Sequence, residues 1–594
     1  MTKRMERMER MEMSDDNSDS SSDSSIEMWA PEPPKNTAKL RTRRAPRKQQ
    51  VEFGLASEEE TMIRLALQRS CKDVKLQVDE PLPSCRVFYP TIEEFAEPLK
   101  YIQKIAPEGR KTGIAKIVPP AGWNPPSMID FEDNKVKIET KLQRLHHLQE
   151  GKEYSNGRKH TLKSYRKAAD TFKEQWLARM NRTELNITSP DIEKEYWKLV
   201  ETSYLPTQVE YANDIDNGLV GSCFPRTRKN IKSMLRKSPT ENVDFTSRDY
   251  YETTAWNLNN LPFAPESCLS HVNARVNGIN IPWMYFGTLF ATFCWHCEDN
   301  YMYSINYMHS GAKKHWYGIP ATDCAKFESA WKATMPERFK EDPDLFFHLV
   351  TMVSPFVAKR NKVNVYSLIQ EPGQFVVTFP QGYHCGFSEG FNCSEAVNFA
   401  LPDWIPYARI CNDRYRLHNR TSVFPHDRLM YLLATKIKLD YATIEGCEHL
   451  LDELVLLAKE ERDYRESYTE DGISTIVVMP PTDVALNEKT MAEDDEKQCC
   501  VCSHSVFFSG IVCACSPIKV ACLRHGPKMC KCAMELKSFV EWISLDTLEK
   551  AVVRVSELLQ ELDTRQLKRA LSDPYHLPPS KRVLPPSSSN IVTY

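Results

Sequence analysis

The chain has 594 residues, 41% of them hydrophobic, which is enough for three or four domains with packed cores. Its formal net charge of -3 excludes a generally basic surface, so only local basic segments could contact nucleic-acid phosphates. No apolar stretch reaches the roughly 20 residues of a membrane span, and Met1–Met13 lacks the apolar core of a secretory signal, so we expect an intracellular protein with no membrane partner.

Residues 1–80 have the composition of a disordered acidic and basic tail. They combine a Ser/Asp run, Ser14–Ser25, with the basic cluster Arg41–Lys48, and such sequence buries too little apolar surface to fold. The basic cluster is a candidate nuclear-import signal or DNA-contacting arm, although a solvated charge run explains it nearly as well. The Pro/Ser-rich segment 578–594 is expected to be a second disordered tail.

The first ordered unit is expected at residues 84–126. A strand-like run ends at Pro90, and Thr91 can cap a helix because Glu94 follows three residues later. Gly113–Pro120 then returns as a strand. The apolar face of the helix would consist of Ile92, Phe95, Leu99 and Ile102.

Helical patterns dominate three further segments. Residues 127–250 form a charged, mixed scaffold, residues 416–482 a helical linker domain broken near Gly446, and residues 548–577 an amphipathic helix. Residues 483–498 have the composition of an acidic linker. The expected core anchors of the scaffold are Tyr165, Phe172, Trp176 and Trp197. Its basic loop, which is a candidate for weak DNA contact, contains Arg226, Arg228, Lys229, Lys232, Arg236 and Lys237.

A candidate metal site is predicted in the middle of the chain. His296 and Glu298 are two residues apart in a strand-like run, so both side chains would point to one face. His384 closes a second apolar run and supplies a third ligand. Two imidazoles and one carboxylate form the facial triad of a non-haem Fe(II) oxygenase. A His-x-Glu pair alone is often accidental, so its sequence context must decide.

A second metal-binding region lies near the C-terminus, at residues 499–547. Eight ligand-type side chains occur there as four close pairs, which is enough for two tetrahedral Zn(II) sites with closed shells and a structural role. Cys500 is an additional thiol beside a ligand. The predicted zinc ligands are Cys499, Cys502, Cys513, Cys515, Cys522, His525, Cys530 and Cys532.

Several motifs around the three iron-ligand candidates resemble those of JmjC-domain histone lysine demethylases. In order they are Trp-His-x-Glu-Asp, Tyr-Ser-Ile-Asn-Tyr, Lys-x-Trp-Tyr-Gly-x-Pro, Phe-Pro-x-Gly-Tyr-His-x-Gly-Phe and Cys-x-Glu-Ala-Val-Asn-Phe. The unit at 84–126 resembles a JmjN segment, and the cysteine-rich region resembles the five-Cys, one-His, two-Cys zinc finger found behind JmjC domains. The resemblance implies a mainly β catalytic core at 251–415, folded as a double-stranded β-helix of the jelly-roll, cupin-like type.

The resemblance also implies roles for individual residues. Fe(II) would be bound by His296, Glu298 and His384. The cosubstrate 2-oxoglutarate would be bound by Tyr211, Phe293, Ser304, Asn306 and Lys314, with Lys314 meeting its far carboxylate, and O2 would be the second cosubstrate. The methyl-lysine channel would be lined by Tyr285, Gly287 and Asn398.

By the same resemblance, the protein would remove methyl groups from a histone H3 tail by N-methyl hydroxylation with release of formaldehyde, acting on nucleosomes in the nucleus. Ala396-Val397 and Trp256–Asn259 look most like the branch that acts on lysine 4 of histone H3, especially its plant-type members. Demethylation of lysine 9 or 36, a catalytically silent chromatin scaffold, and a protein hydroxylase are the alternatives. Two positions depart from the family pattern, Ser310 and Cys223.

Overall fold

The computed structural model describes residues 81–202, 204–227, 235, 243–480 and 482–572. The basic cluster Arg41–Lys48, most of the basic loop that follows Arg226, and the tail at 578–594 lie outside these residues. The expectations for those segments therefore stay predictions.

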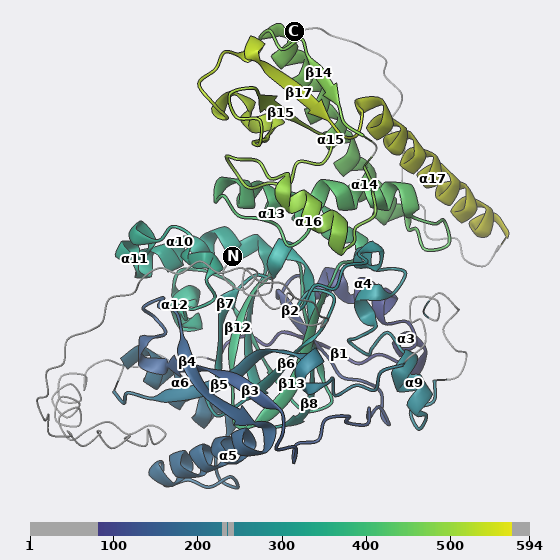
Figure 1. Cartoon of the computed structure of the whole chain (residues 1–594). Coiled ribbons are helices and arrows are strands. Elements are labelled where there is room, and N and C mark those ends of the chain that lie inside the picture. The colour runs from purple at the N-terminus through teal and green to yellow at the C-terminus, as the bar shows by residue number, and fades with distance from the viewer. Residues whose placement is uncertain (1–80, 203, 228–234, 236–242, 481, 573–594) are drawn as a thin grey trace, which may run out of the picture. The chain divides into compact units, whose positions relative to one another are not determined.

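Two sheets form the centre of the molecule, and strands that follow one another along the chain are divided between them (Figure 1). Along the chain, β6, β8, β11 and β13 join the larger sheet, whereas β7, β9, β10 and β12 join the smaller one. This pairing is typical of jelly-roll folds, and it agrees with the expected cupin-type core. The strands are β6 (Trp283–Gly287), β7 (Thr292–His296), β8 (Tyr303–Gly311), β9 (Lys314–Ile319), β10 (Tyr366–Gln370), β11 (Phe375–Thr378), β12 (Tyr383–Ser388) and β13 (Asn392–Phe399).

The larger sheet continues beyond the barrel strands at both edges. On one side β5 pairs with β6, and β3 and β4 follow; on the other side β2 pairs with β11, and β1 follows. Because β2 pairs with β11, which in turn pairs with β8, the N-terminal unit is part of the barrel sheet itself. The added strands are β1 (Arg86–Phe88), β2 (Ile114–Ile117), β3 (Lys137–Arg144), β4 (Ser155–Thr161) and β5 (Gln208–Asp216).

The expected N-terminal helix is present but is divided in two, α3 (Ile92–Phe95) and α4 (Pro98–Gly109). Thr91 and Glu94 form the predicted capping box. The division falls before Pro98, which has no N–H to continue a helix. Of the predicted apolar face, Phe95, Leu99 and Ile102 are buried; Ile92 was wrongly included, because it lies on the exposed first turn and is 49% exposed.

Helices from the scaffold region cover the barrel. The four predicted core anchors of this region are buried, and Trp197 donates its indole N–H to Tyr317 Oη at 2.8 Å. Tyr196 stacks on Phe387 of β12 with 3.9 Å between ring centroids. The scaffold helices are α5 (Leu162–Arg179) and α6 (Ser189–Thr202), and shorter helices are α7 (Asn217–Val220), α9 (Arg248–Thr253), α10 (Cys324–Thr334), α11 (Pro336–Glu341) and α12 (Pro355–Arg360).

Two expectations for the region after the barrel need correction. The helices are interrupted near Gly446 as expected, but the interruption at 437–443 precedes the glycine, which lies in the first turn of α15 and donates its N–H to the Thr443 side chain that caps this helix. The acidic linker is not merely polar, because it contains α16 (Glu488–Glu496), whose Asp494 is buried and accepts two hydrogen bonds from Arg428, each of 2.6 Å. The other helices here are α13 (Ile405–Leu417), α14 (His426–Lys436) and α15 (Ile444–Glu470).

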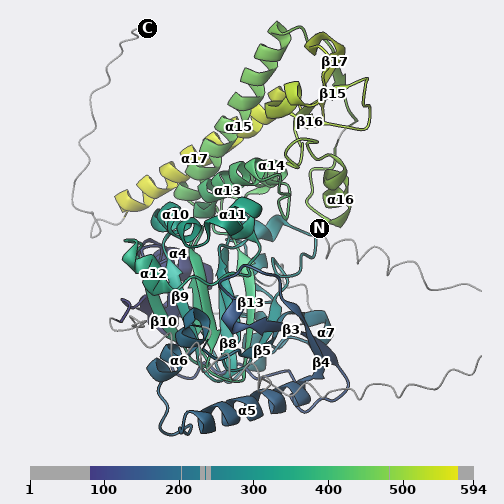
Figure 2. The same cartoon turned by 90° about the vertical axis from the view of Figure 1, so that its left-hand side faces the viewer.

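A small sheet carries the cysteine-rich region, with strand order β14-β17-β15-β16. The last helix, α17 (Leu545–Ser572), packs against α15 and α14 through buried residues such as Leu548 and Val555 (Figure 2). Within the described ranges, no helix is both long and apolar enough to cross a membrane. The strands are β14 (Ile476–Val478), β15 (Ser509–Cys513), β16 (Ala521–Cys522) and β17 (Lys537–Glu541).

Candidate active site and zinc module

The three predicted iron ligands come together at the end of two paired strands. His296 ends β7 and lies directly opposite His384 of β12, so antiparallel pairing joins residues that are far apart in the sequence. Glu298 follows β7 in extended backbone, which keeps its side chain on the same face as His296. One ligand atom from each of the three side chains can be chosen so that all lie within 4.8 Å of one another.

Neighbouring groups orient each of these side chains. His296 Nδ1 lies 2.7 Å from the Cys294 carbonyl, and His384 Nδ1 lies 3.2 Å from the Gly382 carbonyl. Because a carbonyl can only accept, each Nδ1 is the donor and each Nε2 keeps its lone pair for a metal. The Asn398 side chain donates to Glu298 Oε2 at 3.0 Å and holds the carboxylate in place.

The protonation states also suit metal binding. Burial, together with the neighbouring His384, lowers the pKa of His296 to about 4, so its imidazole is neutral. Burial alone would raise the pKa of Glu298, but the close contact with the His384 ring and the hydrogen bond from Asn398 outweigh it and bring this pKa to about 2, so the carboxylate is ionised. A neutral imidazole and an ionised carboxylate are the forms in which these groups coordinate a metal.

A cavity of about 240 Å3 opens at this cluster. His296 and Glu298 form part of its wall, and Tyr285 and Asn398, two of the predicted substrate residues, also line it. Gly287 does not: a Cβ there would meet Asn392 Oδ1 and Ser388 Oγ at 2.6 Å, so a close approach within the sheet explains this glycine. The cavity is lined instead by Gly278, which has φ +81° and a Cβ position 2.9 Å from the Trp283 ring.

Lys314 is a buried cation beside this cavity. Lys314, on β9, is 2% exposed and donates to Ser394 Oγ at 3.0 Å. Burial lowers its pKa to about 8. Three aromatic rings, those of Tyr285, Phe293 and Trp316, lie about 6 Å from its ammonium group. In the described part of the chain Lys314 forms no ion pair, so an anionic ligand would supply the missing counter-charge.

The other predicted cosubstrate residues surround the same region. Tyr211 on β5 is buried, with its ring 6.4 Å from that of Tyr285. On β8, Ser304 shares a hydrogen bond of 2.7 Å with Thr378, and Asn306 Oδ1 accepts from Gln370 at 3.1 Å. The structure therefore brings every predicted cosubstrate residue to the interior of the barrel or its immediate wall.

The eight predicted zinc ligands form two separate groups of four. Pairs that alternate along the chain combine: the first and third pairs form one group, and the second and fourth form the other, each with ligand atoms within 4.8 Å of one another. Three thiols with one imidazole, and four thiols, are both closed shells for tetrahedral zinc. The groups are Cys499, Cys502, Cys522 and His525, and Cys513, Cys515, Cys530 and Cys532.

Comparison with protein families agrees with this arrangement. The jmjN domain matches residues 86–119, the family described as JmjC domain, hydroxylase matches residues 283–399, and the C5HC2 zinc finger matches residues 499–551. This is a JmjN/JmjC-domain protein. The JmjC match covers the barrel strands from β6 to β13, and a JmjC hydroxylase domain implies iron and 2-oxoglutarate.

Relatives of this JmjN/JmjC protein are lysine-specific demethylases by name. It is 38% identical to Lysine-specific demethylase JMJ17 of Arabidopsis thaliana over 62% of this chain and 29% of that protein. It is 33% identical to JMJ703 of Oryza sativa subsp. japonica over 77% and 40%, and 35% identical to Lysine-specific demethylase 5B of Gallus gallus over 70% and 25%. The chain spans less than half the length of each of these curated relatives.

Sequence reasoning about the JmjC domain missed four buried polar contacts. Ser394 holds Lys314, Thr378 holds Ser304, and Gln370 links Trp316 to Asn306. Their sequence signal is weak, because β13 and β10 also carry other polar residues, such as Glu395 and Ser367, and nothing in the sequence singles out Ser394 or Gln370. Such a residue needs a partner when buried, and this was the one hint available.

The two departures from the JmjC pattern lie away from the iron ligands. Ser310 pairs with Cys393 across β8 and β13, and Cys223 Sγ is 3.5 Å from Cys393 Sγ. Neither is among the residues that line the cavity at His296.

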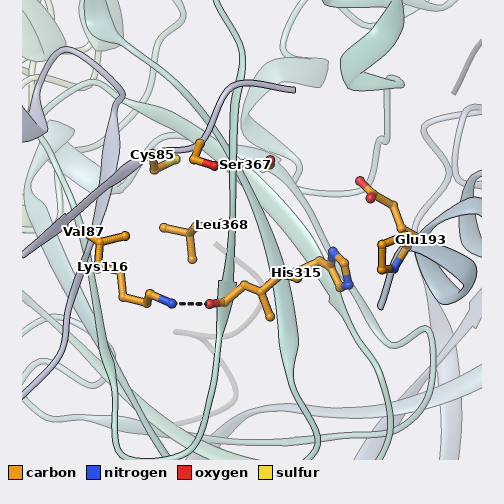
Figure 3. Close-up of a pocket in the computed structure, with 10 residues that line it drawn as sticks. Cys85, Val87, Lys116, Glu193, His315, Ser367 and Leu368 are labelled. Carbon is orange, nitrogen blue, oxygen red and sulfur yellow. Dashed lines mark hydrogen bonds between the residues drawn. The ribbon is translucent and has the colours of Figure 1, made fainter. Parts of the chain in front are cut away.

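A second cavity, of about 280 Å3, is lined by residues of β9, β10 and the N-terminal unit (Figure 3). In Figure 3 the Lys116 side chain reaches across to a backbone carbonyl, that of Ile369, at 2.9 Å. Glu193 and His315 also line this cavity, but each already has a partner: Glu193 accepts from Tyr317 Oη, and His315 pairs with Glu389. Its lining includes none of the three iron-ligand candidates.

Proposed function

We propose that this protein is an Fe(II)- and 2-oxoglutarate-dependent histone lysine demethylase, and that its substrate is tri- or dimethylated lysine 4 of histone H3. One observation carries the proposal: a cluster of two imidazoles and one carboxylate adjoins a buried lysine that forms no ion pair among the described residues. The names of the relatives, which are lysine-specific demethylases, support the choice of substrate class.

The donor set of the cluster fits Fe(II). His296 and His384 would each offer Nε2, and Glu298 one carboxylate oxygen, which leaves three positions of an octahedral ion for other ligands. The backbone carbonyls on both Nδ1 atoms and the Asn398 amide on Glu298 would hold the ligands in orientation. When bound, iron supplies the hydroxylation of an N-methyl carbon by O2, with 2-oxoglutarate converted to succinate and CO2 and formaldehyde released from the hydroxylated product.

Lys314 would bind the far carboxylate of 2-oxoglutarate. A charge-assisted hydrogen bond in a site shielded from water is stronger than a neutral one, and the three rings around Lys314 exclude water. Tyr211, Ser304 and Asn306 would add hydrogen bonds, and Phe293 would pack on the cosubstrate. Binding would also lower the free-energy cost of burying an unpaired cation, so the bound cosubstrate would stabilise the fold.

The methylated lysine would enter through the cavity at His296. Tyr285 would line its path, and Asn398, besides holding Glu298, would face the methyl groups with its remaining polar edge. Gly278 also lines this cavity, whereas Gly287 is not among its lining residues. Because the hydroxylation attacks carbon and needs no lone pair on nitrogen, a trimethylated lysine can be a substrate.

The two groups of four ligands at the C-terminus would hold two structural zinc ions. Both shells are complete, so no position is left for a substrate. The protein would act in the nucleus on the histone H3 tail of nucleosomes, with the basic segments as candidates for weak DNA contact.

The preference for lysine 4 rests on branch resemblance at Ala396-Val397 and Trp256–Asn259. Val397 and Trp256 are buried in the main hydrophobic core, so these residues would mark the branch without contacting the substrate. Discrimination between lysines must then come from contacts to flanking residues of the histone tail, since every methylated lysine has the same head group.

Mass spectrometry of methylated histone H3 peptides tests the proposal. The purified protein, supplied with Fe(II) and 2-oxoglutarate, should demethylate trimethylated lysine 4 and leave lysines 9, 27 and 36 nearly unchanged. Faster turnover at lysine 9 or 36 would move the protein to the other branch. No turnover of any methylated peptide would favour a silent scaffold, and a mass gain of one oxygen without demethylation would favour a protein hydroxylase.

A further inference from the structure

Gln370, the last residue of β10, forms a hydrogen-bond network inside the barrel. It is fully buried and lies directly opposite Lys314 in the pairing of β10 with β9. Its side-chain Oε1 accepts from the Trp316 indole at 3.0 Å. Its Nε2 donates to Asn306 Oδ1 at 3.1 Å, and also lies 3.1 Å from the Gln374 carbonyl and 3.3 Å from the Asn306 carbonyl.

The direction of these hydrogen bonds is fixed at one end. An indole N–H can only donate, so the atom of Gln370 that faces Trp316 must be the oxygen. Nε2 is then turned toward two backbone carbonyls, which can only accept. Asn306 must consequently present Oδ1 to Gln370, and its Nδ2 is directed away from this contact. This chain of hydrogen bonds from Trp316 through Gln370 to Asn306, called the relay below, thus sets which end of the Asn306 amide is available to a ligand.

Asn306 lies between the two ends of the proposed site. On one side along β8 is Ser304, whose partner across the sheet, Asn398, holds Glu298. Asn306 itself pairs with Ala396, two residues from the Ser394 that holds Lys314. In the described part of the chain, no group accepts a hydrogen bond from Asn306 Nδ2, although the residue is only 6% exposed.

We propose that Gln370 is a positioning residue for the cosubstrate: by accepting from Trp316 and donating to Asn306, it holds the Asn306 amide with its N–H2 group toward the carboxylate of 2-oxoglutarate. This rests on the proposed function. With the amide reversed, Asn306 would present an oxygen to an anion and replace an attraction with a repulsion. Gln370 itself would not need to touch the cosubstrate.

The substitution Gln370→Glu tests the relay, because it keeps size and the acceptor for Trp316 but removes the donor to Asn306. The Asn306 amide should then reverse to donate to the new carboxylate. We expect the dissociation constant of 2-oxoglutarate, measured by calorimetry on Mn(II)-loaded full-length protein, to rise about 10- to 100-fold, the cost of one hydrogen bond to a charged group. The KM for the histone peptide should stay unchanged.

Gln374→Glu is the matched control. The same substitution is made four residues further on, where the side chain forms hydrogen bonds with Glu371, and cosubstrate affinity should stay at the wild-type level. Thermal unfolding of both variants shows whether the fold is retained. If Gln370→Glu does not fold, Trp316→Phe, which removes the donor that fixes Gln370, should weaken 2-oxoglutarate binding in the same direction.

A double-mutant cycle separates positioning from other effects of the new charge. In an Asn306→Ala background, Gln370→Glu should have little further effect on 2-oxoglutarate binding, since the amide it acts through is gone. An undiminished effect would mean that the new carboxylate acts directly, for example by pairing with Lys314, and would overturn the relay. Wild-type binding by Gln370→Glu would overturn it too, whereas failure of the wild-type protein to bind 2-oxoglutarate would overturn the proposed function with it.

Discussion

The iron-ligand cluster and the zinc module use similar side chains but are assembled differently. His296, Glu298 and His384 come from two strands whose pairing depends on the whole barrel, and they leave room for further ligands. The eight zinc-module ligands come from four short pairs within a small sheet, and they fill both shells. A barrel held together by its own core can present an incomplete ligand set, whereas a small module depends on its metals.

The largest expected effect comes from removing one iron ligand. His296→Ala should lower demethylation by more than about 1000-fold, equivalent to about 4 kcal/mol of barrier, because the remaining two ligands cannot hold the metal in the reactive position. Thermal stability should change little, since the barrel core does not depend on this side chain. Formaldehyde release and a melting curve measure the two effects.

The control for this variant is His147→Ala, which removes a half-exposed histidine that pairs with Glu150 and lies outside the cavity at His296. It should retain full activity. Normal demethylation by His296→Ala would show that the cluster is not the iron site.

Zinc removal should give the opposite result in the other region. Cys499→Ser breaks one closed shell, so the zinc content should fall from about two to about one per chain, and the module should lose its folded structure because metal binding and folding are coupled there. Elemental analysis and limited proteolysis of the segment measure the outcome.

Cys500→Ser is the matched control, because Cys500 is the next residue, is exposed and belongs to neither ligand group. It should keep both zinc ions and the fold. A Cys499→Ser protein with two zinc ions and an intact module would contradict the ligand assignment.

This contrast also explains what the sequence could reveal. Ligand types and spacing were enough to identify the zinc candidates, because metal chemistry restricts them to few residue types, whereas the iron candidates also needed the motifs around them. Spacing could not say which zinc pairs combine: the alternation of first with third and second with fourth pairs follows from the path of β15 and β16. The hydrogen bond from Asn398 to Glu298 was missed for the same reason, since the two residues are 100 positions apart in the sequence.

Local rules failed where long-range contacts decide the structure. The acidic composition of residues 483–498 predicted a solvated linker. Asp494 is nevertheless buried, because Arg428 of α14 forms a bidentate pair of hydrogen bonds with its carboxylate. The break near Gly446 was predicted, but its position was not: the glycine lies inside the first turn of α15, where Thr443 supplies the N-cap. The capping box at Thr91, by contrast, depends only on neighbours and was predicted correctly.

A smaller effect is expected at the cosubstrate site. Lys314→Met keeps the apolar stem but removes the charge, and the loss of a buried charged partner costs on the order of 2–5 kcal/mol. The KM for 2-oxoglutarate should rise accordingly, while iron binding, measured by metal titration, should stay at the wild-type level. An unchanged KM would exclude Lys314 as the carboxylate partner.

The smallest effect concerns the pH dependence of cosubstrate binding, and it follows from the environment of Lys314. Burial lowers the pKa of its ammonium from 10.5 to about 8, so the group is charged below that pH and loses its proton above it. A neutral amine attracts a carboxylate weakly, and the dissociation constant of 2-oxoglutarate should therefore rise above pH 8, by at most about tenfold per pH unit. Lys314→Arg keeps its charge over this range, so its affinity, although lower because the larger guanidinium fits the space less well, should not follow the same pH profile. Calorimetric titrations of both proteins between pH 7 and pH 9 make the comparison: a wild-type affinity that does not change with pH, or an arginine variant that weakens in parallel, would show that another group controls cosubstrate binding.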